Sequence, residues 1–182
     1  MSAQLLDEVR SLVRSIRGLR CWYVSYGGAA GPTFQLALGK KVRRSVPVRN
    51  PVHSEEYRQF EGEANLLVWC TWRLDGPSGP LTSSDDTPEG ISKGLPQLRE
   101  AKVRGASLID NAGDLIISFS NKLKVRIFCD HVPGAPSFDG NWELWLTDRA
   151  LLVGPGSRFE FVERRQDQEK SLPARQRHSP NG

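Results

Sequence analysis

The N-terminal residues follow the spacing of an amphipathic helix. Apolar side chains recur three and four residues apart, at Leu5, Leu6, Val9, Leu12, Val13 and Ile16. At 3.6 residues per turn this confines them to an arc of about 120°. Ser2 is a suitable N-cap and Gly18 a suitable C-terminal stop. The pattern predicts a helix that packs its apolar stripe on a core.

After residue 20 the apolar positions alternate with period two, which is typical of half-buried strands. Strands are expected over 21–26, 33–39 and 64–74. The segment 40–48 is expected as a further strand that Pro47 ends or places at an edge. A turn at 27–32 and a polar connection at 49–63 separate these strands.

The second half starts with a loop and continues as another series of strands. Residues 75–90 have loop composition, and Thr87 followed by Pro88 predicts the start of a short helix. Strands are then expected within 102–110, 113–120, 122–129, 141–147 and 151–161. Beyond Glu163 almost no apolar residue remains, which predicts a disordered tail over 163–182.

Three short sequence blocks occur twice in the same order. "FQLALG" is matched by "LIISFS", "LVWC" by "RIFC", and "WRL" by "WEL". The expected fold class is therefore α+β, with an N-terminal amphipathic helix and two related antiparallel β-meander units that form a sheet system. The expected domain covers 1–162, with units at 21–74 and 102–162 linked by a loop and short helix over 75–101.

Composition indicates a soluble globular protein without a membrane span. The chain has 182 residues, of which 38% are hydrophobic and 25% charged. It lacks a run of the roughly eighteen apolar residues that a spanning helix needs, and its N-terminus lacks the pattern of a secretory signal. Three cysteines without a CxxC pair favour reduced thiols and a cytoplasmic location.

The net charge of +4 is unevenly distributed along the chain. Residues 1–50 contain nine Lys and Arg against two acids, whereas residues 51–100 contain four against nine. Such a division of charge can orient a charged partner. The net charge of the whole chain is modest, however, and does not by itself indicate that the partner is a polyanion such as a nucleic acid.

The blocks quoted above also support a family resemblance. "GEANLLVWCTWRL", "SSDDTPEG", "GDLIISFSNKLKVRIFCD", "NWELWL" and "VGPGS" resemble phrases of a bacterial family of small cytoplasmic β-rich proteins of unknown function. The likeness covers residues 20–160. It implies a binding protein of the kind found among contact-dependent toxin and immunity genes, and it assigns no functional residues.

The preferred function is non-catalytic binding of another protein, in an immunity or antitoxin-like role. Three aromatic residues lie on strand faces that are not purely apolar, beside polar or charged neighbours. Aromatic residues in such surroundings are common in protein interfaces. The expected partner surface comprises Trp69, Phe128, Trp145, Arg126 and the acidic loop residues Asp85 and Asp86.

Two other functions remain open. Cys129, Asp130 and His131 could form a hydrolase site centred on Cys129 and His131, although neighbouring strand residues point to opposite faces. A weak nucleic-acid surface would use Arg10, Arg14, Arg17, Lys40, Lys41, Arg43 and Arg44. No cofactor or metal is expected, because the cysteines lack zinc spacing and the acidic loop lacks the ligands of a calcium loop.

Overall fold

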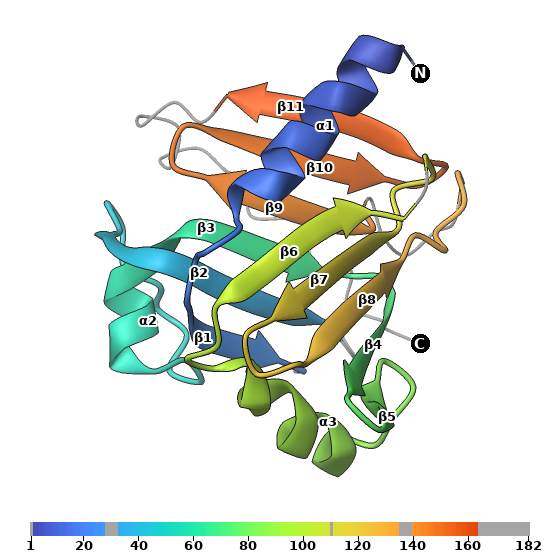
Figure 1. Ribbon diagram of the computed structural model, residues 1–182. Coiled ribbons are helices and arrows are strands. Elements are labelled where there is room, and N and C mark those ends of the chain that lie inside the picture. Colours follow the sequence, from blue (N-terminus) through green and yellow to red (C-terminus); the bar gives the residue numbers. More distant parts are fainter. Residues whose placement is uncertain (1, 28–32, 110, 135–139, 164–182) are drawn as a thin grey trace, which may run out of the picture.

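A computed structural model describes residues 2–27, 33–109, 111–134 and 140–163, which form two antiparallel sheets with short helices (Figure 1). The expected turn at 27–32 and the expected tail thus lie almost wholly outside the described residues. In chain order the elements are α1 (Ala3–Ser15), β1 (Cys21–Tyr26), β2 (Phe34–Arg43), α2 (Glu55–Gln59), β3 (Phe60–Val68), β4 (Thr71–Gly76), β5 (Gly79–Ser83), α3 (Pro88–Gly94), the 3₁₀ helix η1 (Leu95–Leu98), β6 (Val103–Leu108), β7 (Leu115–Phe119), β8 (Lys124–Phe128), β9 (Trp142–Leu146), β10 (Arg149–Gly154) and β11 (Arg158–Glu163).

Helix α1 has the boundaries that its sequence predicts. The Ser2 hydroxyl accepts a hydrogen bond from the Leu5 amide at 3.2 Å, which caps the first turn. Gly18 follows the helix with φ of +90°, a conformation that favours glycine. The buried residues Val9, Leu12 and Val13 lie on the predicted apolar stripe. The α+β fold class is confirmed.

The strands are shared between the sheets in an unexpected way. The first sheet has the order β1-β2-β3-β9-β10-β11 and the second the order β5-β4-β8-β7-β6. The chain therefore crosses from the first sheet to the second between β3 and β4, and returns between β8 and β9. Each expected β unit contributes strands to both sheets.

The predicted strand over 64–74 was wrong, because the first crossing interrupts it. The backbone amides of Trp69 and Cys70 both donate to the Asn141 carbonyl, at 2.8 and 3.1 Å. This partner ends the pairing of β3 and turns the chain into β4. The alternation of apolar and polar residues continues through the break, so the pattern does not reveal it.

Three further local predictions were wrong. The segment 40–48 is no separate strand, because β2 continues to Arg43 through a register shift between Leu38 and Lys41. The polar connection contains α2, whose first turn is capped by Ser54, and the start of β3. The expected loop contains β5, which pairs with β4 through a tight turn. Both missed elements have only five residues, too few to show a period.

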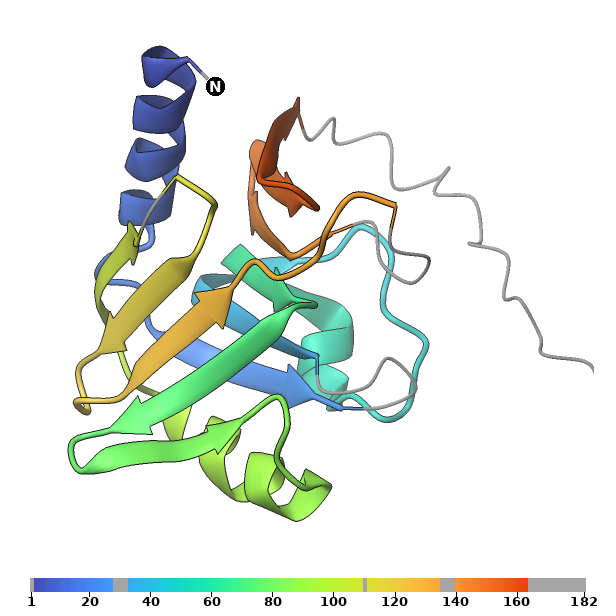
Figure 2. The same ribbon diagram turned by 90° about the vertical axis from the view of Figure 1, so that its right-hand side faces the viewer.

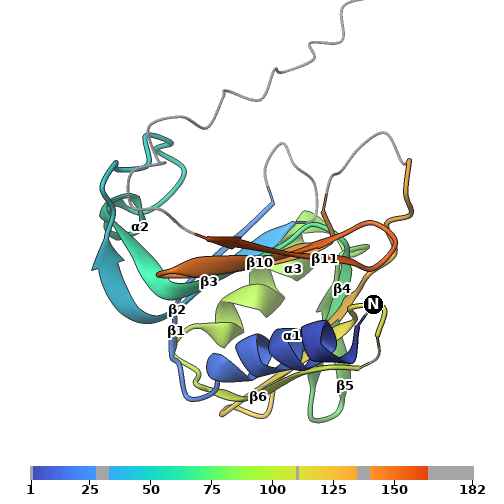
Figure 3. The same ribbon diagram turned by 90° about the horizontal axis from the view of Figure 1, so that it is seen from above.

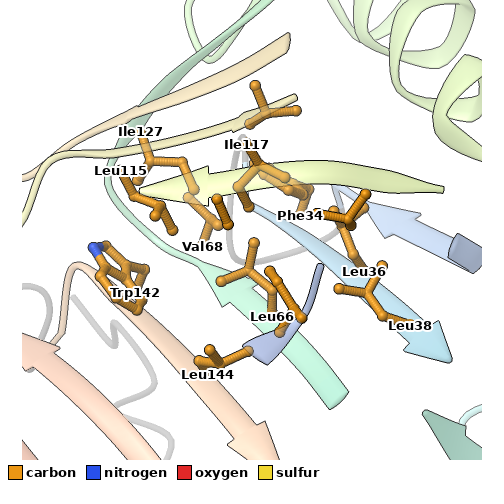
Figure 4. Close-up of a cluster of buried hydrophobic side chains, with 14 of the residues drawn as sticks. Phe34, Leu36, Leu38, Leu66, Val68, Leu115, Ile117, Ile127, Trp142 and Leu144 are labelled. Atoms are coloured by element: carbon orange, nitrogen blue, oxygen red, sulfur yellow. The ribbon is translucent and has the colours of Figure 1, made fainter. Parts of the chain in front are cut away.

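The core lies between the inner faces of the two sheets. Figure 4 shows Phe34, Leu36, Leu66 and Val68 of the first sheet facing Leu115, Ile117 and Ile127 of the second, with Trp142 and Leu144 beside them. Trp72 and Trp142 have no exposed surface. Figure 3 shows α1 between the β10–β11 end of the first sheet and β6 of the second, so the helix closes one end of this core.

Five strands of the first sheet correspond in order to the five strands of the second, and β11 has no counterpart. The order β1-β2-β3-β9-β10 matches β6-β7-β8-β4-β5, with α1 preceding β1 as α3 and η1 precede β6. Where β1 and β6 begin, the backbone hydrogen bonds also match. Gly18 donates to Val103 at 2.8 Å, as Glu100 donates to Cys21 at 2.6 Å. Gly18 and Glu100 both have positive φ. The two halves thus match in strand order and in these local backbone features.

We expect Asn141→Ala to lower the free energy of unfolding by about 2–3 kcal/mol. The Asn141 side chain is fully buried, accepts from the His131 amide at 3.1 Å and donates to the Gly154 carbonyl at 3.0 Å. Its removal leaves both groups without this partner. Denaturant unfolding measures the change. Asn111→Ala is the control, since Asn111 is exposed and makes one long contact with Arg10. Equal losses in the two variants would contradict the assigned role.

Candidate functional site: the basic face of the second sheet

The outer faces of the two sheets differ in what covers them. On the first sheet, the connection between β2 and β3 brings α2 over β1 and β2, where Tyr57 packs on Tyr23 and Ala37. The corresponding connection on the second sheet, between β7 and β8, is only a turn. In Figure 1 no described helix lies across β6, β7 and β8. The outer face of the second sheet is therefore the more accessible of the two.

Aromatic packing attaches α2 to the first sheet. The rings of Tyr23 and Tyr57 stack with centroids 4.2 Å apart. The Tyr57 hydroxyl donates to the Gln35 side chain at 2.7 Å, and the Arg44 guanidinium lies over the Tyr57 ring at 4.9 Å. Arg44 Nε also donates to the Tyr57 and Phe60 carbonyls. These contacts support a structural role for the cluster, including Arg44, which the sequence analysis placed in the alternative nucleic-acid surface.

His53 belongs to the same cluster. Its Nδ1 lies 3.2 Å from the Tyr23 hydroxyl, and its ring packs beside Tyr57 at 4.8 Å. Burial lowers the pKa of His53, and the nearby Arg44 lowers it further. The pKa values of Tyr23 and Tyr57 are raised, chiefly by burial. The cluster therefore favours the neutral forms of all three rings.

Two neighbouring cross-strand rows on the outer face of the second sheet form an array that includes three basic residues. Cross-strand pairing aligns one outer row as Ser107, Ile116, Arg126, Arg73 and Ser83. A neighbouring row is Gly105, Ser118, Lys124, Asp75 and Pro80. Figure 2 shows β4, β8 and β7 side by side, as this pairing requires.

Two grooves cross this array, with volumes of about 600 and 570 Å³. They share Ser118 and Lys124. Seven basic residues line them, and we define these as the basic face: Arg14, Arg17, Arg73, Arg104, Lys122, Lys124 and Arg126. Asp75 is the one acidic residue among the described residues that line either groove. The face thus favours an anionic ligand.

Asp75 joins the two arginines at the centre of the basic face. Its carboxylate accepts from Arg73 Nε and from Arg126 Nε, each at 2.7 Å. Arg73 and Arg126 are directly paired across β4 and β8, so their like charges would otherwise repel. Burial by itself would raise the pKa of Asp75, but hydrogen bonds from both arginines outweigh it and lower the pKa.

The residues expected to bind a protein partner lie in four places. Arg126 and Phe128 are on β8 in the second sheet. Trp145 is on β9 in the first sheet, where its Nε1 donates to Glu143 at 2.7 Å, and Trp69 lies at the first crossing. Asp85 and Asp86 precede α3. The structure does not bring the six residues together into one surface.

Asp86 has local structural contacts. Its carboxylate accepts from the Thr87 amide at 2.8 Å and from the Thr82 hydroxyl at 3.0 Å. Asp85 donates its amide to the Ser83 hydroxyl at 3.3 Å. These bonds shape the entry into α3.

The residues expected to bind nucleic acid are also divided. Arg14 and Arg17 belong to the basic face. Arg10 pairs with Asp7 and bonds Asn111. The remaining four, Lys40, Lys41, Arg43 and Arg44, lie on or beside β2 in the first sheet. Two of them form ion pairs: Lys41 pairs with Glu56, and Arg44 pairs with Glu61. The expected N-terminal basic region is therefore not continuous.

Arg73, Arg104, Lys122 and Lys124 are the basic-face residues that the sequence analysis missed. Arg73, Arg104 and Lys124 alternate with the buried positions Trp72, Val103 and Val125, which marks them as outward-facing, whereas Lys122 lies in the turn before β8. Their grouping depends on the order of strands, which alternation does not reveal.

Two of the three cysteines, Cys70 and Cys129, lie at the crossings between the sheets, and Cys21 begins β1. Cys70 and Cys129 come next to the paired residues Thr71 and Phe128. A hydrogen bond with Cys129 and burial raise the pKa of Cys70. His131 Nδ1 lies 3.0 Å from the Gly140 carbonyl, and Asp130 accepts from the Thr71 amide at 3.3 Å. These contacts connect the crossing segments.

Within the described ranges, no three His, Cys, Asp or Glu side chains are grouped so that they could bind a metal ion. No helix in those ranges is long and apolar enough to cross a membrane.

Comparison with protein-family models, curated proteins and solved structures found no match. The resemblance described above thus remains an expectation from the quoted motifs, and the function must be inferred from the residues themselves.

We expect the thiols of the folded protein to react with iodoacetamide at least about tenfold more slowly than those of the unfolded chain. Burial raises the pKa of Cys21 to about 12, the pKa of Cys70 is also raised, and Cys129 is half-buried against Cys70. Mass spectrometry of each cysteine over time, at neutral pH, measures the rates. Rapid modification of Cys129 in folded protein would instead favour the hydrolase alternative.

We expect acidification from pH 7.5 to 5.5 to destabilise the protein through His53. Its pKa is lower in the folded state, so the unfolded chain binds more protons as the pH falls below about 6.5. The contribution to stability is complete above that value and is lost as the pH falls through the folded pKa. Denaturant unfolding at several pH values measures it. His53→Gln should reduce the pH dependence, and an unchanged slope would contradict the assignment.

Proposed function

We propose that this protein is a non-catalytic binding module that captures an acidic protein on the basic face, in an immunity or antitoxin-like role. The observation that carries the proposal is the imbalance of charge at the outer side of the second sheet, across which no described helix lies: seven basic residues and one acid line its two grooves. Complementary charge accelerates association and aligns the partner.

The chemistry of the grooves supports binding rather than catalysis. Among the described residues that line them there is no His or Cys, so neither the common general base nor a thiol nucleophile is present there. The contact between the thiols of Cys70 and Cys129 also favours a structural role. A hydrolase remains the alternative that the thiol measurement tests.

An acidic protein fits the basic face better than a nucleic acid does. Single-stranded nucleic acids are usually bound by stacking bases on exposed aromatic rings. Phe119 is the one aromatic residue that lines either groove in the described part of the chain, and it is only 3% exposed. The half-buried Ile116 of the smaller groove adds apolar area beside the cations, whereas the half-buried Phe128 lies outside both grooves. An acidic protein surface offers both apolar and charged contacts.

The proposal includes a cytoplasmic location in a bacterial cell and a fold built from an internal repeat. Three cysteines without a CxxC pair support the location, and the quoted family motifs support the bacterial origin. The corresponding strand orders support the repeat.

We expect two charge reversals on the basic face to abolish partner capture. The full chain serves as bait, together with an Arg104→Glu/Lys124→Glu variant and a control Lys40→Glu/Arg43→Glu variant. All four sites are exposed, and the control pair lies on the first sheet. One acidic protein should be retained in stoichiometric amount by the wild type and the control, and lost from the face variant. With purified partner, the dissociation constant of the face variant should rise at least about tenfold.

Several results would overturn this proposal. One is the absence of a stoichiometric acidic partner. Another is equal loss of binding in the face variant and the control. A third is salt-sensitive retention of DNA or RNA that the face variant alone loses, which would assign the face to a nucleic acid. Thermal unfolding of each bait confirms that the variants fold.

A further inference from the structure

The arginine pair at the centre of the basic face has a geometry that singles it out. Arg73 and Arg126 face each other across β4 and β8, and both line the larger groove. Asp75, two residues beyond Arg73 on the same face, accepts from the Nε of each arginine. One carboxylate thus orients two guanidinium groups that would otherwise repel each other.

Asp75 leaves unused donors on this pair. Arg126 donates to Asp75 through its Nε alone. Within the described chain, its two terminal nitrogens donate no hydrogen bond. Arg73 directs one terminal nitrogen to Asp75 at a long 3.4 Å. Lys124, the cross-strand partner of Asp75, contributes a further exposed cation to the same groove. The site therefore retains positive charge and N–H donors after Asp75 is counted.

The first sheet has a row that corresponds to that of the arginine pair but contains no arginine. The row that corresponds to Ile116, Arg126 and Arg73 consists of Gln35, Leu67 and Glu143. The corresponding strands are therefore paired without any arginine or central ion pair. The arginine pair is an addition to the second sheet rather than a requirement of the fold.

We propose that Arg73 and Arg126 form a site for a carboxylate side chain of the partner, with Lys124 beside it. The planar guanidinium fork suits the planar carboxylate, to which it can donate two parallel hydrogen bonds. This inference rests on the proposed function, because it names the group by which the acidic partner is recognised.

The test uses a labelled peptide of alternating Glu and Gly, a length-matched Gln and Gly peptide, and an oligothymidylate of similar length. Fluorescence anisotropy with the full chain at low salt measures each dissociation constant. The Glu peptide should bind at least tenfold more tightly than the Gln peptide and the oligothymidylate. Arg126→Lys keeps the charge but removes the fork, and should weaken Glu-peptide binding about tenfold.

Arg149→Lys is the matched control, since Arg149 is also a strand arginine in an ion pair, with Glu8, but lies on β10. It should leave binding unchanged. Arg73→Lys replaces Arg126→Lys if the latter does not fold. Equal effects of Arg126→Lys and Arg149→Lys, or oligothymidylate binding as tight as the Glu peptide, would overturn the inference.

The two proposals can fail separately. If a protein partner is lost on charge reversal at Arg104 and Lys124 but is bound normally by Arg126→Lys, the basic face is the interface and the arginine pair is only structural. If the Glu peptide binds with the expected dependence on Arg126 but no protein partner exists, the carboxylate site is supported and the proposed function is not.

Discussion

Burial of the two sheets against each other is the interaction on which the rest of the structure depends. Trp72 and Trp142 are fully enclosed between them, and burying an apolar side chain of such size contributes at least roughly 1.5–3 kcal/mol. Both sheets contain strands from each half of the chain, so neither half completes a sheet or a core alone. The crossings near Cys70 and Cys129 are thus central, and the buried Asn141 fastens them by accepting from Trp69 and Cys70.

The two sheets share a buried core between their inner faces and differ on their outer faces. The same strand order leads to opposite outcomes on the two sheets. On the first, α2 and Tyr57 cover the outer face, because the connection between β2 and β3 is long enough to fold back. On the second, the short turn between β7 and β8 leaves the face open. This second sheet contains the arginine pair and its neighbouring lysines.

The sequence predicts what is local in this fold and misses what is not. Helix α1 and most strands follow from periodicity, because a stripe or an alternation records which side of an element is buried. The break at Trp69 and Cys70 depends on Asn141, about seventy residues away, and alternation continues through it. The candidate site shows the same limit. The sequence identifies Arg126 and Arg14 separately as surface cations. It is the order of the strands that brings them onto one face with Arg104.

The distribution of charge along the chain therefore differs from its distribution in space. Of the nine basic residues in the first fifty positions, only Arg14 and Arg17 belong to the basic face. The seven basic residues and one acid of this face carry a net charge of +6, which exceeds the +4 of the whole chain. The remainder is consequently net negative. Salt at physiological concentration limits the range of the electrostatic interaction between exposed charges to about 8 Å. A partner near the basic face therefore interacts mainly with the cations of that face. Under the proposed function, an acidic partner is therefore attracted mainly to the basic face, which orients it before contact.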